Sequence, residues 1–394
     1  MENAYVGMVA GLLILLASMA SVELGLSVAL IEIAFGVVAG NFLGLHTTPW
    51  LDFLASFASI VLTFLAGAEV DVTLMREKLK ESVVIGGISF AAPFFGAWAF
   101  CQFVLGWSLQ ASQLTGVALS TTSLAVVYAV LVETGLTAHT TGKLIMAATF
   151  VTDFGTAAAL SLLFIRPNWW LLAFVAVSVA IIVGMPALHR WFFARYGNRV
   201  IEPEIKGAFA ALLVLMFVAE LAQSHAVLPA FILGLAVSHI FERHREEQRR
   251  FRVVTFAFLT PFFFLKGGMN VSLGLVWANL GLLVMLFLVK LVTKSLGVYP
   301  PSIRYLSSRD AMFTTLLMST GLTFGTISSL YGLRTGIFNQ AQFSVIVTVV
   351  VLSAIVPTFI AQRWFEPRLE PDEPPAVPTR PALVPAAENE ADRV

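Results

Sequence analysis

The chain has little cysteine and little charge. Its single cysteine, Cys101, lies in an apolar stretch, which excludes an internal disulfide and a thiolate metal cluster. Charged residues make up 12% of the 394 residues, about half the share of a soluble domain. The 24 basic and 24 acidic residues balance, so net charge favours no nucleic acid partner. Because 58% of the residues are hydrophobic and the mean hydropathy is +0.86, the composition indicates a multi-pass membrane protein.

Two other kinds of segment are missing from the sequence. The first apolar segment has no basic start and no clear cleavage site, so we expect a retained helix and not a signal peptide. No strand with a glycine-rich turn follows the last apolar segment, so we expect no nucleotide-binding domain, no cofactor and no enzymatic activity. The proline-rich, acidic stretch 366–394 predicts a disordered tail.

Apolar runs long enough to cross a bilayer recur along residues 1–365. Because one crossing takes about 20 residues, we expect about thirteen transmembrane helices in an all-α polytopic protein. Their expected ranges are 5–21, 25–44, 52–69, 83–105, 111–133, 138–164, 168–192, 206–222, 226–240, 253–269, 272–296, 309–331 and 340–362.

The loops differ in their content of lysine and arginine. Basic residues gather in alternate loops and in the tail, whereas the other set of loops carries only Arg166 and Arg334. Because loops rich in lysine and arginine stay in the cytoplasm, we expect the N-terminus outside and the C-terminus in the cytoplasm.

The two halves of the chain carry similar interruptions. Six spans, a linker span and six further spans would form an inverted-topology repeat, in which 111–133 is equivalent to 309–331. The first contains the polar stretch Ser120–Ser123, and the second contains Ser319–Thr326. We therefore expect two broken helices near the bilayer midplane. The alternative is that these small residues only let helices pack closely.

One acid lies deep in an apolar run. Asp153 falls inside 138–164, where a carboxylate costs at least about 2.5–3.5 kcal/mol on insertion scales. A buried structural acid is the alternative, but the neighbouring polar break favours a function. Oxygen ligands suit an alkali cation, so we predict a site at Asp153 where a proton competes with Na⁺ or K⁺. The other predicted ligands are Thr152, Thr121, Thr122, Ser123 and Thr323.

Other charges in the spans are candidates for supporting roles. Lys290 and Lys294 lie one turn apart in 272–296, and Lys294 falls near the predicted cytoplasmic end, where it can also snorkel to the interface. Lys266 can snorkel or pair with a carboxylate. The accessory acids, each also a candidate for a structural ion pair, are Glu69, Glu133, Glu220 and Glu32.

Several short segments carry a family resemblance. They are Ile31–Gly40, Phe64–Asp71, Ala219–Leu221, Pro229–Gly234, and Pro261–Phe264 with Gly268 and Met269. In sequence and in their order along the chain, they resemble the monovalent cation:proton antiporter-2 family of bacterial sodium/hydrogen and Kef-type potassium/hydrogen exchangers. The resemblance covers essentially all of 5–362.

The resemblance implies a two-part molecule in a bacterial cytoplasmic membrane. A scaffold (about 1–70 and 204–269) would form a homodimer, a helix at 168–192 would link the parts, and a core (about 83–164 and 272–362) would carry the ion. Asp153 matches the family's ion-carrying aspartate, and Lys294 matches its basic residue better than Lys290 does. The sequence departs from the family at Thr152, where electrogenic members have a second aspartate, and at Thr323, where members often have glutamate.

Together these features predict a secondary active antiporter of Na⁺ or K⁺ and protons that works by alternating access. With one central carboxylate, exchange is expected to be electroneutral, and pH homeostasis is the expected role. The alternatives are a sodium-coupled symporter of an organic anion on a similar fold, and a membrane sensor that transports nothing.

Overall fold

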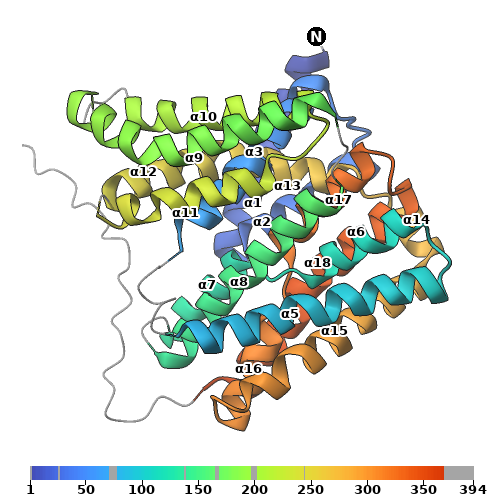
Figure 1. The fold of residues 1–394 in the computed structure, drawn as a ribbon. Coiled ribbons are helices and arrows are strands. Elements are labelled where there is room, and N and C mark those ends of the chain that lie inside the picture. Colours follow the sequence, from blue (N-terminus) through green and yellow to red (C-terminus); the bar gives the residue numbers. More distant parts are fainter. Residues whose placement is uncertain are drawn as a thin grey trace, which may run out of the picture.

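The computed structural model describes residues 2–24, 27–70, 78–136, 139–164, 168–196, 202–243 and 245–367, and these residues are almost entirely helical (Figure 1). The helices before residue 200 are α1 (Glu2–Leu24), α2 (Val28–Asn41), α3 (Pro49–Ala68), α5 (Leu79–Ala99) with the π-helical end η1 (Phe100–Val104), α6 (Leu109–Ser120), α7 (Leu124–Glu133), α8 (Thr140–Leu163) and α9 (Trp169–Tyr196). The later helices are α10 (Pro203–Leu221), α11 (Val227–Arg243), α12 (Arg245–Val254), η3 (Thr255–Leu259), α13 (Thr260–Met269), α14 (Leu273–Ala278), α15 (Leu280–Ser302), α16 (Ser308–Leu317), α17 (Leu322–Arg334), α18 (Gln340–Ile360) and η4 (Ala361–Phe365).

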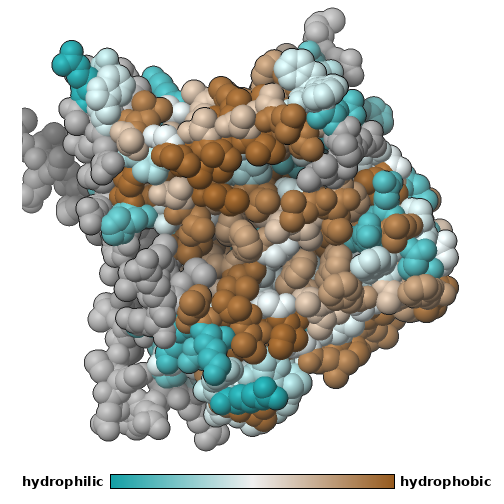
Figure 2. Space-filling view, in the orientation of Figure 1, coloured by the Kyte–Doolittle hydropathy of each residue, from teal (hydrophilic) through white to brown (hydrophobic). Residues whose placement is uncertain are grey.

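The helices have the length and composition of membrane spans. Among the described residues, eight helical segments are long and apolar enough to cross a bilayer, and α2 and Val227–Phe241 are shorter apolar helices. Figure 2 shows apolar side chains across the middle of one face, with hydrophilic ones gathered mainly toward its edges. The predicted all-α membrane fold is confirmed, whereas thirteen crossings and the inverted repeat stay predictions. Residues 368–394 of the predicted tail 366–394 lie outside the described residues.

Glycines allow two pairs of helices to approach closely. A Cβ on Gly36 of α2 would collide with the carbonyl oxygen of Leu265, and one on Gly268 of α13 would collide with that of Ile33. Gly67 of α3 meets α11 in the same way. Without a hydrophobic driving force between helices in lipid, such close backbone contact is a main source of their association. The fragments that carry the family resemblance therefore include the contact points between α2 and α13 and between α3 and α11.

A second group of helices packs around α5. Its largest contacts are with α15, α6 and α8, and Figure 1 shows α5 and α15 side by side. The linker-like helix α9 packs instead on α10 and α11.

One predicted span is displaced along the chain. The apolar run 272–296 contains two helices, α14 and α15, and α15 continues to Ser302. Asn279 separates them, and its side chain donates a hydrogen bond back to the carbonyl oxygen of Leu275 within α14. Hydropathy did not reveal this boundary because both helices are apolar. Lys294 consequently lies inside α15, so its predicted position near the helix end was wrong.

Candidate functional site

The two predicted interruptions exist, and hydrogen bonds join them. α6 ends at Ser120 and α7 begins at Leu124, while α16 ends at Leu317 and α17 begins at Leu322. Serine and threonine favour such breaks because their hydroxyls bond to nearby carbonyls in competition with the helix.

Two threonines of the first break hold the second. The Thr121 hydroxyl donates to the carbonyl oxygen of Gly321 at 3.0 Å. The Thr122 hydroxyl donates to the carbonyl oxygen of Met318, also at 3.0 Å. Each hydroxyl uses its single hydrogen on a carbonyl and keeps lone pairs for another partner. The two breaks thus form one polar crossing inside an apolar protein.

Ser123 adds a third hydrogen bond between the two breaks. Its backbone N–H donates to the Thr320 hydroxyl at 3.3 Å, and Thr320 in turn donates to the carbonyl oxygen of Leu317 at 2.8 Å. The Ser123 hydroxyl is buried and has no hydrogen-bond partner within the described part of the chain. It therefore keeps its oxygen available for a ligand.

Lys294 lies at the crossing and not at the interface. Its side chain is fully buried, and its ammonium donates to the hydroxyls of Ser89 on α5 at 3.0 Å and of Thr122 at 3.1 Å. The snorkelling alternative for Lys294 is therefore wrong. The extent of α15 explains this result, because the helix continues to Ser302 and Lys294 lies inside it among other helices.

Lys290 is equally buried but bonded differently. Among the described residues its ammonium has no hydrogen-bond partner. It lies against the second break, since a Cβ added to Gly321 would come within 2.5 Å of the Lys290 Nζ. A side chain at position 321 would displace this ammonium or the Thr121 hydroxyl. The two lysines also repel each other electrostatically.

Asp153 lies on α8 and is 1% exposed. Its carboxylate interacts electrostatically with Lys294, and its Oδ1 has no hydrogen-bond partner among the residues described. A buried carboxylate oxygen without a donor is costly unless something else binds it. The arrangement thus combines one carboxylate, one hydrogen-bonded ammonium and several hydroxyl oxygens.

Thr152 and Thr323 are placed less centrally. Thr152 donates to the carbonyl oxygens of Ala148 at 3.0 Å and of Gly86 on α5 at 3.3 Å, so its hydroxyl joins α8 to α5. Thr323 lies in the first turn of α17 with a partly exposed side chain, and it makes none of the hydrogen bonds described for the crossing.

The accessory acids are spread over the molecule. Glu69 pairs with Arg252 at 3.1 Å, and Glu220 lies 3.5 Å from Arg334. Glu32 is buried in α2, and its Oε2 has no partner in the described part of the chain. Glu133 ends α7, and its side chain lies outside what the structure describes. None of the three acids with described side chains, Glu69, Glu220 and Glu32, takes part in the hydrogen bonds described for the crossing.

Sequence reasoning missed two polar residues of the crossing. Ser89 is the lone serine of the apolar span 83–105, and its place at the crossing becomes visible only through its 3.0 Å hydrogen bond with Lys294. Thr320 stood inside the polar stretch Ser319–Thr326 that was recognised, yet it was not selected as a site residue. Its position two residues before α17 was the available signal.

A family model for the transmembrane sodium/hydrogen exchanger matches residues 10–366. The chain belongs to this family. Among similar proteins, the probable Na(+)/H(+) antiporter 3 of Methanocaldococcus jannaschii is 24% identical over 352 residues, which cover 86% of this chain and 89% of that protein. The Na(+)/H(+)-K(+) antiporter GerN of Bacillus cereus is 26% identical over 358 residues, covering 85% of this chain and 89% of GerN.

A solved structure shares the fold of this exchanger-family chain. The sodium proton antiporter MjNhaP1 from Methanocaldococcus jannaschii, determined at pH 8, superposes with a TM-score of 0.70. The match covers 93% of this chain and 100% of that one, at 15% identity. The family resemblance read from the sequence is confirmed by the family-model match over residues 10–366.

Proposed function

We propose that the protein is a secondary active antiporter that exchanges Na⁺ or K⁺ for protons at Asp153. The relatives named as Na(+)/H(+) antiporters support the exchange of a cation for a proton. The single observation that carries the assignment of the site is the buried Asp153 beside Lys294, next to the crossing of two broken helices. A proton and an alkali cation would occupy the carboxylate in turn.

The oxygen atoms around Asp153 support an alkali cation as its ligand. The Asp153 Oδ1 and the Ser123 hydroxyl lack partners among the described residues, and Thr122 keeps a lone pair. Alkali cations take oxygen ligands, so these groups are suitable. In the empty state Lys294 supplies the positive charge that balances the carboxylate.

Alternating access would move a core past a scaffold. The helices around α5 and α15 pack mainly on one another, as do the pairs α2 with α13 and α3 with α11, which supports a division into core and scaffold. The core is about 83–164 and 272–362, the scaffold about 1–70 and 204–269, and α9 near 168–192 would link them. A homodimer in a bacterial cytoplasmic membrane, with the N-terminus outside, completes this proposal.

Exchange in sealed vesicles tests the function. Purified protein in liposomes with an inside-acid pH gradient should release internal protons when Na⁺, K⁺ or Li⁺ is added outside, and a pH series should identify the preferred cation. Protein-free vesicles and the Asp153→Asn variant serve as controls. Absence of cation-dependent proton movement from correctly folded protein would refute the antiporter assignment.

Exchange is predicted to be electroneutral because, among the described residues, Asp153 is the one acid found to interact electrostatically with Lys294, the lysine hydrogen-bonded at the crossing. Thr152 stands where a second proton-carrying aspartate would be needed, and its hydroxyl is bonded to two carbonyls. Net movement of one charge would couple transport to voltage by about 2.3 kcal/mol per 100 mV. A potential imposed with a permeant anion should therefore leave the rate and the final cation gradient unchanged. Clear voltage dependence would assign Lys294 or another buried group as a second proton carrier.

Thr122→Val is predicted to weaken the apparent cation affinity about tenfold, with a smaller effect on the maximal rate. The substitution keeps volume but removes one oxygen and its bonds to Met318 and Lys294, and a lost hydrogen bond of about 1.4 kcal/mol corresponds to a factor of ten. Thr323→Val should have a smaller effect because its side chain is partly exposed. Thr348→Val, whose hydroxyl bonds only within α18, is a matched control. Unchanged affinity in the Thr122 variant would mean that the first break serves only packing.

A further inference from the structure

A cavity lies on the face that carries Arg334, which is the predicted outer face. Its volume is about 320 Å³, and it is lined by residues of α3, α10, α13 and α17 together with the loop before α11. The lining includes Ser56, Glu220, His225, Lys266, Tyr331 and Arg334. Under the proposed division, α17 belongs to the core and the other elements belong to the scaffold, so the cavity lies where the two parts meet.

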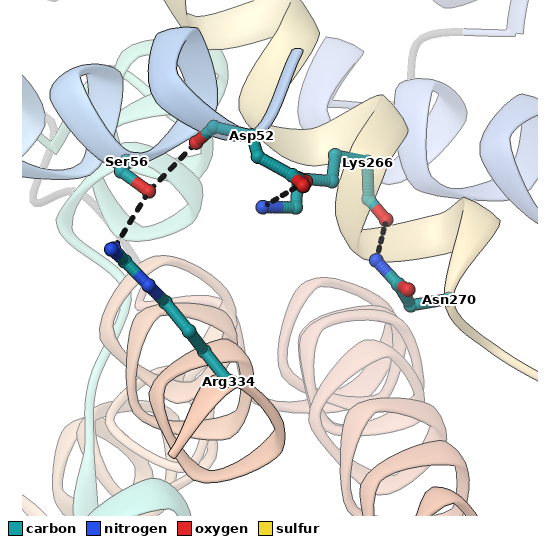
Figure 3. Close-up of polar contacts among 5 residues, drawn as sticks. All are labelled: Asp52, Ser56, Lys266, Asn270 and Arg334. Carbon is teal, nitrogen blue, oxygen red and sulfur yellow. Dashed lines mark hydrogen bonds and ion pairs between the residues drawn. The ribbon is translucent and has the colours of Figure 1, made fainter. Parts of the chain in front are cut away.

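Arg334 connects the two parts across this cavity. Its Nη1 donates to the Ser56 hydroxyl on α3 at 3.2 Å, as Figure 3 shows, and its Nη2 lies 3.5 Å from a Glu220 oxygen on α10. Ser56 is itself held, because its hydroxyl donates to the carbonyl oxygen of Asp52 at 2.7 Å. A single guanidinium at the end of α17 therefore contacts two scaffold helices.

An aromatic contact also joins the loop before α11 to α17 at this cavity. The rings of His225 and Tyr331 meet edge to face with centroids 4.0 Å apart. Burial, together with the nearby Arg334 guanidinium, lowers the pKa of His225 to about 4. The imidazole is therefore neutral near pH 7 and adds no charge to the contact.

A second ion pair in this region lies within the scaffold and does not join it to the core. Asp52 on α3 and Lys266 on α13 are 2.8 Å apart, and both helices belong to the scaffold (Figure 3). Lys266 also accepts, through its carbonyl oxygen, a hydrogen bond of 2.9 Å from Asn270. Like the contact of Arg334 with Glu220, this is an ion pair at the cavity, but it joins two scaffold helices. Breaking it therefore serves as a control for breaking the Arg334 contact.

We propose that Arg334 is a latch that holds the end of α17 against α3 and α10 and keeps the outer mouth of the site closed in this conformation. The inference rests on the proposed function, since a latch matters only if the core moves past the scaffold. Outward opening would require Arg334 to leave Ser56 and Glu220. The Arg334 and Glu220 side chains are 59% and 67% exposed, so the contact is screened and breaking it should shift the two populations only a few-fold.

A cysteine reporter in the cavity tests the latch. The buried Cys101 is first replaced by alanine, and Ser59, which lines the cavity, is replaced by cysteine. A membrane-impermeant thiol reagent is then applied to the outside of right-side-out vesicles. Arg334→Gln should raise the labelling rate of the reporter a few-fold, and Glu220→Gln should raise it as well. The double variant should be no faster than Arg334→Gln alone, because that substitution already removes the contact with Glu220 as well as the one with Ser56.

Asp52→Asn is the matched control, since it breaks an ion pair inside the scaffold and should leave the labelling rate unchanged. Glu220→Gln keeps the test decisive if Arg334→Gln fails to fold. Labelling that is unchanged in both variants, or raised equally by Asp52→Asn, would overturn the latch.

The labelling test separates the latch from the ion chemistry. Labelling requires movement but no ion exchange, so the same shift in an Asp153→Asn background would support the latch even if Asp153 does not carry the ion. With exchange intact, Arg334→Gln should also lower the external cation concentration for half-maximal exchange a few-fold, because a larger fraction of the protein is open to the outside. An unchanged value together with unchanged labelling would exclude a role for Arg334 in opening.

Discussion

Asp153→Asn is expected to reduce cation/proton exchange to the level of protein-free vesicles while the protein remains folded. The amide has nearly the same size as the carboxyl group but neither its negative charge nor its exchangeable proton. Asp153 is the negative charge that would balance an alkali cation in this buried site, and the hydroxyls of Thr122 and Ser123 supply none. Lys294 keeps its two hydrogen bonds to Ser89 and Thr122, so the fold should persist, with a lower unfolding temperature because the buried ammonium has lost its carboxylate.

The measurement compares exchange and folding in the same preparation. Proton release on addition of Na⁺, K⁺ or Li⁺ reports exchange, while gel filtration and a thermal melt report folding. Glu246→Gln is a suitable control, because Glu246 is 74% exposed and pairs only loosely with Arg249 at 3.8 Å. It should exchange at the normal rate. Normal exchange by a folded Asp153→Asn protein would remove the basis of the proposed site.

The sequence predicted Asp153 and the two breaks because both violate the apolar pattern of a span. A carboxylate in a run of about 20 apolar residues is costly, and that cost marks it without any structure. Clusters of hydroxyl residues at Ser120–Ser123 and Ser319–Thr326 likewise stand out against their spans. The structure adds that Thr121 and Thr122 bond to the carbonyls of the opposite break, so the two clusters meet.

Pairings between distant segments were not predictable from the same pattern. Lys294 and Ser89 are 205 residues apart in sequence, and Arg334 and Ser56 are 278 apart, so neither contact leaves a local signal. The role of Thr152 was also hidden, because hydropathy does not show that its hydroxyl faces the backbone of Gly86. The predicted position of Lys294 near a helix end was wrong for a related reason. A continuous apolar run gives the number of residues in the membrane but not the point at which the helix enters it.

Lys294→Met is expected to lower exchange by at least about tenfold and to destabilise the protein. Methionine fills a similar volume, but the bonds to Ser89 and Thr122 and the charge opposite Asp153 are lost. Breaking a buried charge pair from one side typically costs about 3–5 kcal/mol, because the remaining charge has no partner. A thermal melt should therefore show a clear drop in the unfolding temperature. Exchange should fall because the empty site no longer has its balancing ammonium.

Lys290→Met separates the two lysines, which lie one turn apart and are equally buried. Among the described residues the Lys290 ammonium has no hydrogen-bond partner, and it repels Lys294, so its removal should leave stability unchanged or raise it. Exchange should continue. The double variant Asp153→Asn, Lys294→Met should be more stable than Lys294→Met alone, because it leaves no carboxylate without its partner. If Lys290→Met abolishes exchange while Lys294→Met behaves normally, Lys290 supports the carboxylate. The hydrogen bonds of Lys294 to Thr122 and Ser89 would then serve only to hold α15 against the crossing.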